Sequence, residues 1–249
     1  MHQEIDKYAH NSPLCNLDPR MKVISLMTLI FSVVLLPRLE LVSFALLFSI
    51  ALLFVSRLPL RFALHFLKWP FMFITFFLLI MPFSIEGTPV FSVGNVIATY
   101  EGLKYGVLIA LRASSAVILA LIMIATTKFG TLLKALEKLK VPNALIQILM
   151  FSYRYSFTFA QEFDRMRLAA RARGFNPKTS MRTLRVLGSM AGMLFVKSYE
   201  RAERVFWAMR ARGYDGSVRM LSELKAGRRD WAFACFIIAF AALLHLVGG

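Results

Sequence analysis

The chain has 249 residues, 58% of them hydrophobic, and a formal net charge of +16. A soluble domain is roughly half apolar, and the apolar runs here are long enough to cross a bilayer, so we expect a polytopic membrane protein. In such a protein, excess Lys and Arg mark cytoplasmic loops more often than a nucleic-acid surface. Cys15 and Cys235 indicate neither a disulfide framework nor a zinc site.

Five apolar segments, taken in chain order, are predicted to be membrane-spanning helices. They cover residues 23–36, 39–55, 69–83, 103–126 and 231–247. The first is too short to cross the hydrocarbon core alone and needs help from its flanking residues. The expected fold class is an all-α polytopic membrane protein, with about five transmembrane helices and a cytoplasmic region of three helices.

The distribution of Lys and Arg predicts the orientation of these helices. Cations precede the first span and fill the loop between the second and third, whereas residues 84–102 contain no Lys or Arg. The positive-inside rule then places the N-terminus in the cytoplasm and the C-terminus outside. Residues 128–229 hold 21 of the 30 Lys and Arg but 7 of the 14 acids, so this region accounts for most of the net charge.

The predicted organisation has four parts. They are a cytoplasmic N-terminal segment (1–22), transmembrane helices one to four (23–127), a cytoplasmic helical region (128–229) and a C-terminal transmembrane helix (230–249). Within the cytoplasmic region, helices are predicted over about 131–140, 142–173 and 181–212. The last two are apolar first and basic last, and a short turn joins them, so we expect a helical hairpin whose basic ends project away from the membrane core.

The two long helices end in the same way. RMRLAARARGF (165–175) and RVFWAMRARGY (204–214) align without a gap at an offset of 39 residues. Each contains Ala-Arg-Gly followed by an aromatic residue, and glycine suits the left-handed position that closes a helix. The motif residues are Ala172, Arg173 and Gly174, and Ala211, Arg212 and Gly213; the candidate supporting residues are Arg171, Phe175, Arg210 and Tyr214.

Two ordinary roles are open to these arginines. Cations in a last turn interact favourably with the helix dipole, and basic residues contact anionic lipid. Neither role explains the repetition over eleven aligned positions. The repetition favours two matched contacts with a pair of similar partner surfaces, because the guanidinium groups of Arg173 and Arg212 form bidentate pairs with carboxylates.

The sequence gives no indication of chemistry carried out by the chain itself. It has no Gly-rich phosphate loop, and its four histidines are scattered without metal-ligand spacing, so no catalytic residue, cofactor or metal site is predicted. The interior of the predicted spans lacks Asp and Glu, which a proton- or cation-coupled carrier would normally need.

Residues 103–126 carry two features with two interpretations each. Arg112 either hydrogen-bonds helix carbonyls or a hydroxyl, or contacts a partner subunit. Small residues recur every four positions and form a seam that allows close helix approach in lipid. The seam serves internal packing or forms the face for a membrane partner. Its members are Gly102, Gly106, Ala110 and Ser114.

The chain resembles the T component of energy-coupling factor transporters. The similar segments are DPRMK before the first span, TTKFGTLLKALEKLKVP after the fourth, YRY at 153–155, and ERAERVFWAMRARGYDG at the second basic helix end. The resemblance covers roughly residues 6–216. The opening DKYAHNSPLCNLDPR and the last two of these segments are most similar to the CbiQ branch, which serves cobalt uptake.

The resemblance implies a scaffold and not an enzyme. It would bind two CbiO-like ATPase subunits in the cytoplasm and a CbiM-like substrate-capturing subunit in the bilayer, with a small CbiN-like subunit as a further candidate. Arg173 and Arg212 would enter grooves on the ATPases, and residues 128–229 would be a coupling region. The location implied is the inner membrane of a bacterial or archaeal cell.

The resemblance leaves the metal open. Cobalt and nickel systems share these motifs, so selectivity would lie in another chain, with cobalt as the first candidate. The alternative function is a self-contained permease or channel with a basic cytoplasmic regulatory domain. Such a protein needs a polar pathway through the spans, and the sequence shows none.

Overall fold

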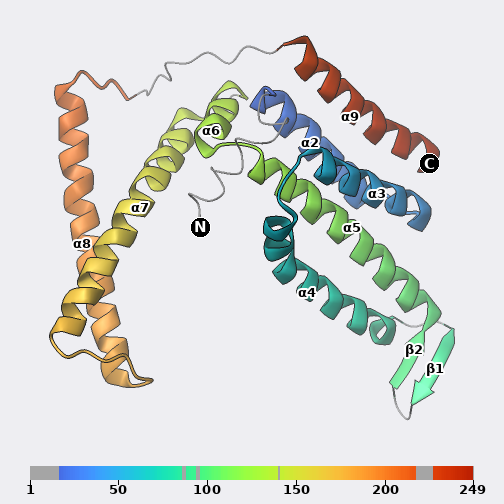
Figure 1. Ribbon diagram of the computed structural model, residues 1–249, viewed down its shortest axis with the longest axis horizontal. Helices are drawn as coiled ribbons and strands as arrows, with labels where there is room; N and C mark the ends of the chain where they lie inside the picture. Colours follow the sequence, from blue (N-terminus) through green and yellow to red (C-terminus); the bar gives the residue numbers. More distant parts are fainter. Residues whose placement is uncertain (1–16, 86–87, 94–95, 140, 217–226, 249) are drawn as a thin grey trace. The chain divides into compact units, whose positions relative to one another are not determined.

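The computed structural model describes residues 17–85, 88–93, 96–139, 141–216 and 227–248. It divides into two compact units (Figure 1). The first comprises Met1–Ala135 with Leu224–Gly249, and the second comprises Leu136–Glu223. Most of the predicted N-terminal segment, including Cys15, lies outside the described residues.

The first unit contains the predicted membrane helices. They are α2 (Pro19–Leu35), α3 (Leu39–Val55), α4 (Leu60–Ser84), α5 (Tyr100–Ala125) and α9 (Arg228–Gly248). Asp18 begins α2 as its N-cap, because its side chain accepts a hydrogen bond from the backbone N–H of Arg20. The prediction of an all-α polytopic membrane protein is confirmed by this arrangement of apolar helices.

Helix α5 is central to this unit because α2, α3 and α4 all pack against it, while α9 packs on α2. The core contains Leu29 of α2, Val42 of α3, Leu119 and Ile122 of α5, and Ile237 of α9, none of them more than 1% exposed. Many large apolar side chains point outward instead. An outward apolar surface suits contact with lipid, where exposed hydrophobic groups carry no penalty.

Three of the described helices are long and apolar enough to cross a membrane. These are the segments Ala63–Ser84, Tyr100–Ala125 and Arg228–Val247, while Leu39–Val55 is apolar but shorter. Helices α2 and α3 have 17 residues each. At 1.5 Å per residue they extend about 26 Å, slightly less than the roughly 30 Å hydrocarbon core. They would therefore need flanking residues to span, as the sequence predicts for the first.

The connection between α4 and α5 contains a β-hairpin that the sequence did not reveal. Strand β1 (Pro89–Val93) pairs antiparallel with β2 (Val96–Thr99). Thr99 ends the hairpin and begins α5, because its hydroxyl accepts from the backbone N–H of Gly102. The hydroxyl also donates to the carbonyl oxygen of Ile85 at 2.7 Å, which ties the hairpin to the end of α4.

The remaining helices follow their predicted positions closely. α6 (Phe129–Lys138) contains residues of both units; α7 (Asn143–Ala172) and α8 (Met181–Ala211) belong to the second. Pro142 lies at the N-cap of α7, one position before the first turn where it was expected. Ser180 is the N-cap of α8, and its side chain accepts from the N–H of Thr183.

Candidate functional site

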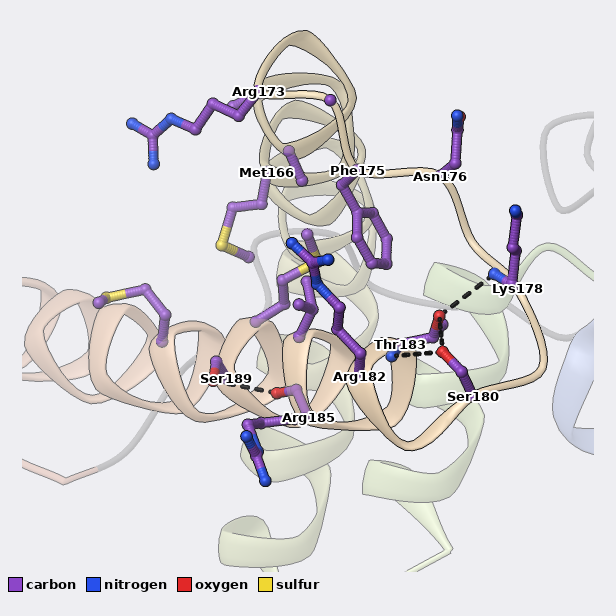
Figure 2. Close-up of a pocket in the computed structure, with 16 residues that line it drawn as sticks. Met166, Arg173, Phe175, Asn176, Lys178, Ser180, Arg182, Thr183, Arg185 and Ser189 are labelled. Atoms are coloured by element: carbon purple, nitrogen blue, oxygen red, sulfur yellow. Dashed lines mark hydrogen bonds between the residues drawn. The ribbon is translucent and has the colours of Figure 1, made fainter.

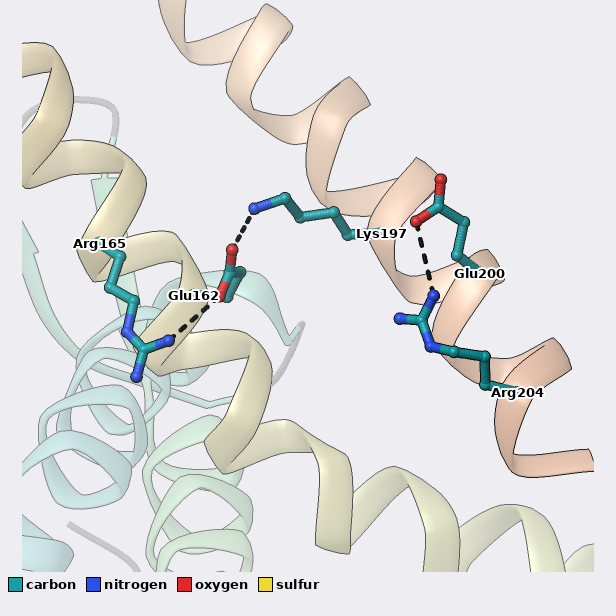
Figure 3. A network of polar contacts seen from close by, with 5 residues as sticks. All are labelled: Glu162, Arg165, Lys197, Glu200 and Arg204. Carbon is teal, nitrogen blue, oxygen red and sulfur yellow. Dashed lines mark hydrogen bonds and ion pairs between the residues drawn. The ribbon is translucent and has the colours of Figure 1, made fainter. Parts of the chain in front are cut away.

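The two long helices of the second unit form an antiparallel pair (Figure 1). Glu162 of α7 accepts a hydrogen bond from the ammonium group of Lys197 of α8 (Figure 3). Where α7 begins and α8 ends, the hydroxyl of Tyr214 donates to Gln147 Oε1 at 2.5 Å, and Gln147 Nε2 donates to the carbonyl of Gly216 at 2.8 Å. The end of α8 is therefore held beside the first turns of α7.

The repeated sequence forms the same local structure twice. We call residues 171–175 the first basic end and residues 210–214 the second basic end. Gly174 has φ of 80° and Gly213 has φ of 84°. Such left-handed backbone is the conformation in which glycine closes a helix without steric cost. The prediction that these glycines occupy left-handed cap positions is confirmed.

Both ends have the hydrogen bonds of a Schellman motif. At the first, the N–H of Gly174 donates to the carbonyl of Arg171 at 2.9 Å, and that of Phe175 donates to Ala170 at 3.0 Å. At the second, Gly213 donates to Arg210 at 3.0 Å and Tyr214 donates to Met209 at 3.1 Å. The C-cap residues are Arg173 and Arg212. Equal positions in the repeat thus have equal backbone geometry.

Antiparallel pairing places the two basic ends at opposite ends of the helical hairpin. The first lies at the turn between α7 and α8, and the second lies where α8 stops. Helix α8 has 31 residues. At 1.5 Å per residue this separates the ends by on the order of 45 Å. The two ends are therefore separate points of the hairpin and not one joint surface.

The arginines of the two ends are exposed. Among the described residues, no ion pair within 4.0 Å involves Arg171, Arg173, Arg210 or Arg212. The helix dipole is the favourable interaction that the structure leaves to them. Their guanidinium groups are therefore available to a partner surface.

Basic residues farther from the ends do have partners (Figure 3). Arg165 lies 3.8 Å from Glu162, and Arg204 lies 3.8 Å from Glu200. The hydrogen bond from Lys197 lowers the pKa of Glu162 below its ordinary value; desolvation opposes this effect, and the nearby charge of Lys197 adds to it. Charge is thus balanced along the middle of the hairpin and unbalanced at its ends.

A cavity of about 770 Å³ adjoins the first basic end. Its walls come from the last turns of α7, the connecting turn and the first turns of α8 (Figure 2). The charged residues that line it are all cations: Arg173, Lys178, Arg182 and Arg185. Met190 lines the cavity too and is 8% exposed. The sequence pattern does not single out Lys178, Arg182 or Arg185, because only the turn between the helices brings them to the same cavity as Arg173.

A buried polar network in the first unit was also missed. The ammonium group of Lys22, 1% exposed, donates to the carbonyl of Thr126 at 2.8 Å. The carboxylate of Asp230 accepts from the backbone N–H of Asp18 at 3.0 Å and from that of Gly227 at 2.7 Å. These bonds join the start of α2 to the end of α5 and the start of α9. Of this network, the sequence draws attention only to the DPRMK segment, which is one of the segments that resemble the transporter family.

The structure also places Arg112 and the small-residue seam of α5. Arg112 donates from Nη2 to the carbonyl of Leu36, the C-cap of α2, which is the first of its two predicted interpretations. At Gly106, an added Cβ would lie 3.2 Å from Met81 Cβ of α4. At Gly102 it would lie 2.8 Å from the carbonyl oxygen of Met81. These two glycines therefore pack inside the chain.

Among the described residues, no group of three or more His, Cys, Asp or Glu side chains could hold a metal ion. The second unit instead presents an elongated pair of helices with two equivalent, cationic and exposed ends. Such an arrangement suits attachment to other proteins at two separated points.

Comparison with known proteins gives matches along most of the chain. A family model described as cobalt transport protein, CbiQ, matches residues 10–222. The chain is 32% identical over 254 residues to an uncharacterised protein of Methanocaldococcus jannaschii, covering 97% of this chain and 85% of that protein.

Bacterial relatives carry a more specific name. The energy-coupling factor transporter transmembrane protein EcfT of Exiguobacterium sibiricum is 31% identical over 221 residues, which is 83% of this chain and 84% of that protein. The protein of the same name from Bacillus subtilis is 29% identical over 258 residues, which is 98% of this chain and 97% of that protein.

Proposed function

Since the chain belongs to the CbiQ family of cobalt transport proteins, we propose that it is the transmembrane T component of an energy-coupling factor transporter. In this role it couples ATP hydrolysis by two CbiO-like ATPase subunits to the uptake of a transition-metal ion, with cobalt as the first candidate. A separate CbiM-like membrane subunit captures the ion, with a CbiN-like subunit as a further candidate. The chain itself is non-catalytic.

One observation carries this proposal: the second unit presents the same Schellman-closed helix end twice, each with an exposed arginine at its C-cap. Two equivalent ends about 45 Å apart fit two similar grooves on two separate subunits better than one groove on a single protein. A guanidinium group is suited to such grooves because it forms bidentate pairs with carboxylates and stays charged.

The helices provide a physical route for coupling. If ATP draws the two ATPases together, each pushes on one end of the α7–α8 hairpin. The hydrogen bond between Glu162 and Lys197 and the bonds of Gln147 hold the two helices to each other, so a push on one end reaches the other helix. The coupling residues we propose are Ala172, Arg173, Gly174, Ala211, Arg212 and Gly213.

The membrane part follows from the same proposal. The N-terminus and residues 128–229 lie in the cytoplasm of a bacterial or archaeal cell and the C-terminus outside, because Lys and Arg concentrate in the coupling region. Within the seam of α5, Gly102 and Gly106 face α4 and serve internal packing. The surface that remains for the capture subunit to bind is the outward-facing apolar surface of the membrane helices.

Copurification tests the proposed function. The full chain, tagged and extracted from its own membranes in mild detergent, should bring two ATPase subunits and one further membrane protein with it. Vesicles containing the purified chain alone should neither hydrolyse ATP nor admit Co²⁺. Rapid Co²⁺ entry through the chain alone, with no ATPase copurified, would instead establish the self-contained permease.

A further inference from the structure

We propose that the cavity between the end of α7 and the start of α8 binds an acidic segment of the ATPase subunit at the first basic end. This inference rests on the proposed function and extends it from the arginine at the C-cap to a second, concave contact surface. The residues that carry it are the cations Arg173, Lys178 and Arg182 and the apolar side chains Met166 and Met190, all of which line the cavity.

The charge of the cavity selects the chemistry of its occupant. Arg173 is the C-cap of α7, Lys178 belongs to the connecting turn and Arg182 to the first turn of α8, so three segments of the chain contribute cations to the cavity. Figure 2 shows Arg182 extending from α8 toward Phe175 and the end of α7. No carboxylate lines this cavity, and among the described residues none lies within 4.0 Å of these cations.

This concentration of positive charge is unfavourable for the isolated chain. Like charges repel, and the first turn of α8 contains Arg182 but no acid, although a helix N-terminus favours anions. A bound carboxylate-bearing segment would relieve both effects. Its negative charges would also direct the approach of the partner.

The interior of the cavity adds a second requirement. Met166, Met190 and Met193 line it together with Val186 and Phe175. Methionine side chains are flexible and adapt to apolar groups of different shapes. The occupant we infer is therefore a segment with carboxylates near its ends and an apolar side chain between them.

The second basic end differs in its surroundings, although its backbone is the same. Tyr214, the equivalent of Phe175, is hydrogen-bonded to Gln147. Asp215 follows it, whereas Asn176 is the equivalent residue after Phe175. We therefore expect the acidic-segment contact at the first end only, and a stronger dependence of ATPase binding on salt at that end.

The test titrates the copurified ATPase subunits onto the full chain in nanodiscs of neutral lipid, at low and high NaCl. The variant is Lys178→Gln with Arg182→Gln. The matched control, Arg154→Gln with Arg204→Gln, removes the same charge from exposed positions of α7 and α8 outside the cavity. We expect the cavity variant to bind one of the two ATPase subunits roughly tenfold more weakly and with less salt dependence, and the control to stay within about twofold of the parent.

The outcomes separate this proposal from the proposed function. Equal binding by the cavity variant and the control would overturn the cavity proposal while the T-component assignment stands. If the parent chain binds no ATPase, the proposed function itself fails. A parallel titration with vesicles containing anionic lipid covers a different occupant: loss of vesicle binding by the cavity variant, with ATPase binding intact, would assign the cavity to lipid headgroups and overturn the proposal.

Discussion

At the residue scale, the C-cap arginines should differ from the arginines two positions before them. Two residues correspond to about 200° around a helix, so Arg171 points away from the direction of Arg173. Arg173→Ala or Arg212→Ala should weaken ATPase binding by about 2–5 kcal/mol, because the partner carboxylate stays behind unpaired. Arg171→Ala should cost less. Titration of ATPase subunits onto each variant in detergent measures these differences.

Lysine substitutions provide the control for this prediction. Lysine keeps the positive charge but lacks the planar fork of donors, so Arg173→Lys should recover little of the lost affinity. If the arginines only interact with the helix dipole or with lipid, small and similar losses are expected at all four positions, together with full tolerance of lysine. Unchanged binding by the Arg173→Ala, Arg212→Ala double variant would refute the matched-contact interpretation.

The seam of α5 gives a second prediction for a single residue. In Gly106→Leu, the new Cβ would lie 3.2 Å from Met81 Cβ, so α4 would have to move away from α5. We expect a loss of about 1–3 kcal/mol of stability, seen as a lower melting temperature in detergent. Gly192→Leu is the matched control, because nothing lies within 4 Å of a Cβ at that position of α8. Equal melting temperatures of both variants would mean that the α4–α5 contact tolerates separation.

At the element scale, the sequence predicted helices better than the contacts between them. Apolar runs and the breaks at Pro142 and Gly174 predicted α7 within a residue at each end. The sequence did not predict the β-hairpin because its strands have only five and four residues. Such short segments show no clear alternation of apolar and polar residues. The bond between Lys22 and Thr126 was missed for another reason: 104 residues separate the partners, and only the fold brings them together.

The candidate site also combines features that the sequence predicts with features that only the fold creates. The two Schellman ends follow from local sequence, since Ala-Arg-Gly plus an aromatic residue contains everything their hydrogen bonds need. Their separation does not, because it depends on how α7 and α8 pair. The cations of the cavity were likewise hidden: Lys178 and Arg182 belong to a turn and to the next helix, where each looks like an ordinary surface residue.

The contact between α7 and α8 should depend on pH. Lys197 lowers the pKa of Glu162 from its ordinary value of 4.5, so the folded state favours the ionised carboxylate. This stabilising contribution is complete above the ordinary pKa and is lost as the pH falls through the lower folded value. Hydrogen exchange of the amides around Glu162 and Lys197 should therefore accelerate as the pH falls below the ordinary pKa of 4.5, after correction for intrinsic rates.

Two variants isolate this effect. Glu162→Gln should exchange faster than the parent at neutral pH and lose the additional acceleration in acid. Glu200→Gln is the control, because Glu200 contacts Arg204 within α8 and does not connect the two helices. If Glu162→Gln and the parent show the same pH profile, the pair between Glu162 and Lys197 does not hold the hairpin together.

At the scale of the whole molecule, the chain joins its two ends within one membrane unit. Helix α2, the first helix of the described residues, packs against α9, although residues 36–227 lie between them in the sequence. The bond from the N–H of Asp18 to Asp230 joins residues 212 positions apart. This connection allows the second unit to be inserted between α5 and α9 in the sequence while the helices of the first unit remain one compact unit.

The connection through Asp230 gives the last prediction. Asp230→Ala leaves the backbone N–H groups of Asp18 and Gly227 without their acceptor at a position that is 7% exposed. The N–H of Asp18 is a buried donor, and leaving it unsatisfied costs about 1–3 kcal/mol, whereas Gly227 is exposed and its N–H can bond to water. The melting temperature of the full chain in detergent should therefore fall. Asp230→Asn keeps one carbonyl oxygen as an acceptor and should lose roughly half as much. Glu203→Ala, at an exposed position of the second unit, is the control and should leave the melting temperature unchanged. The interpretation fails if Asp230→Ala melts with the parent, because the ends of α2 and α9 would then be held by their apolar packing alone.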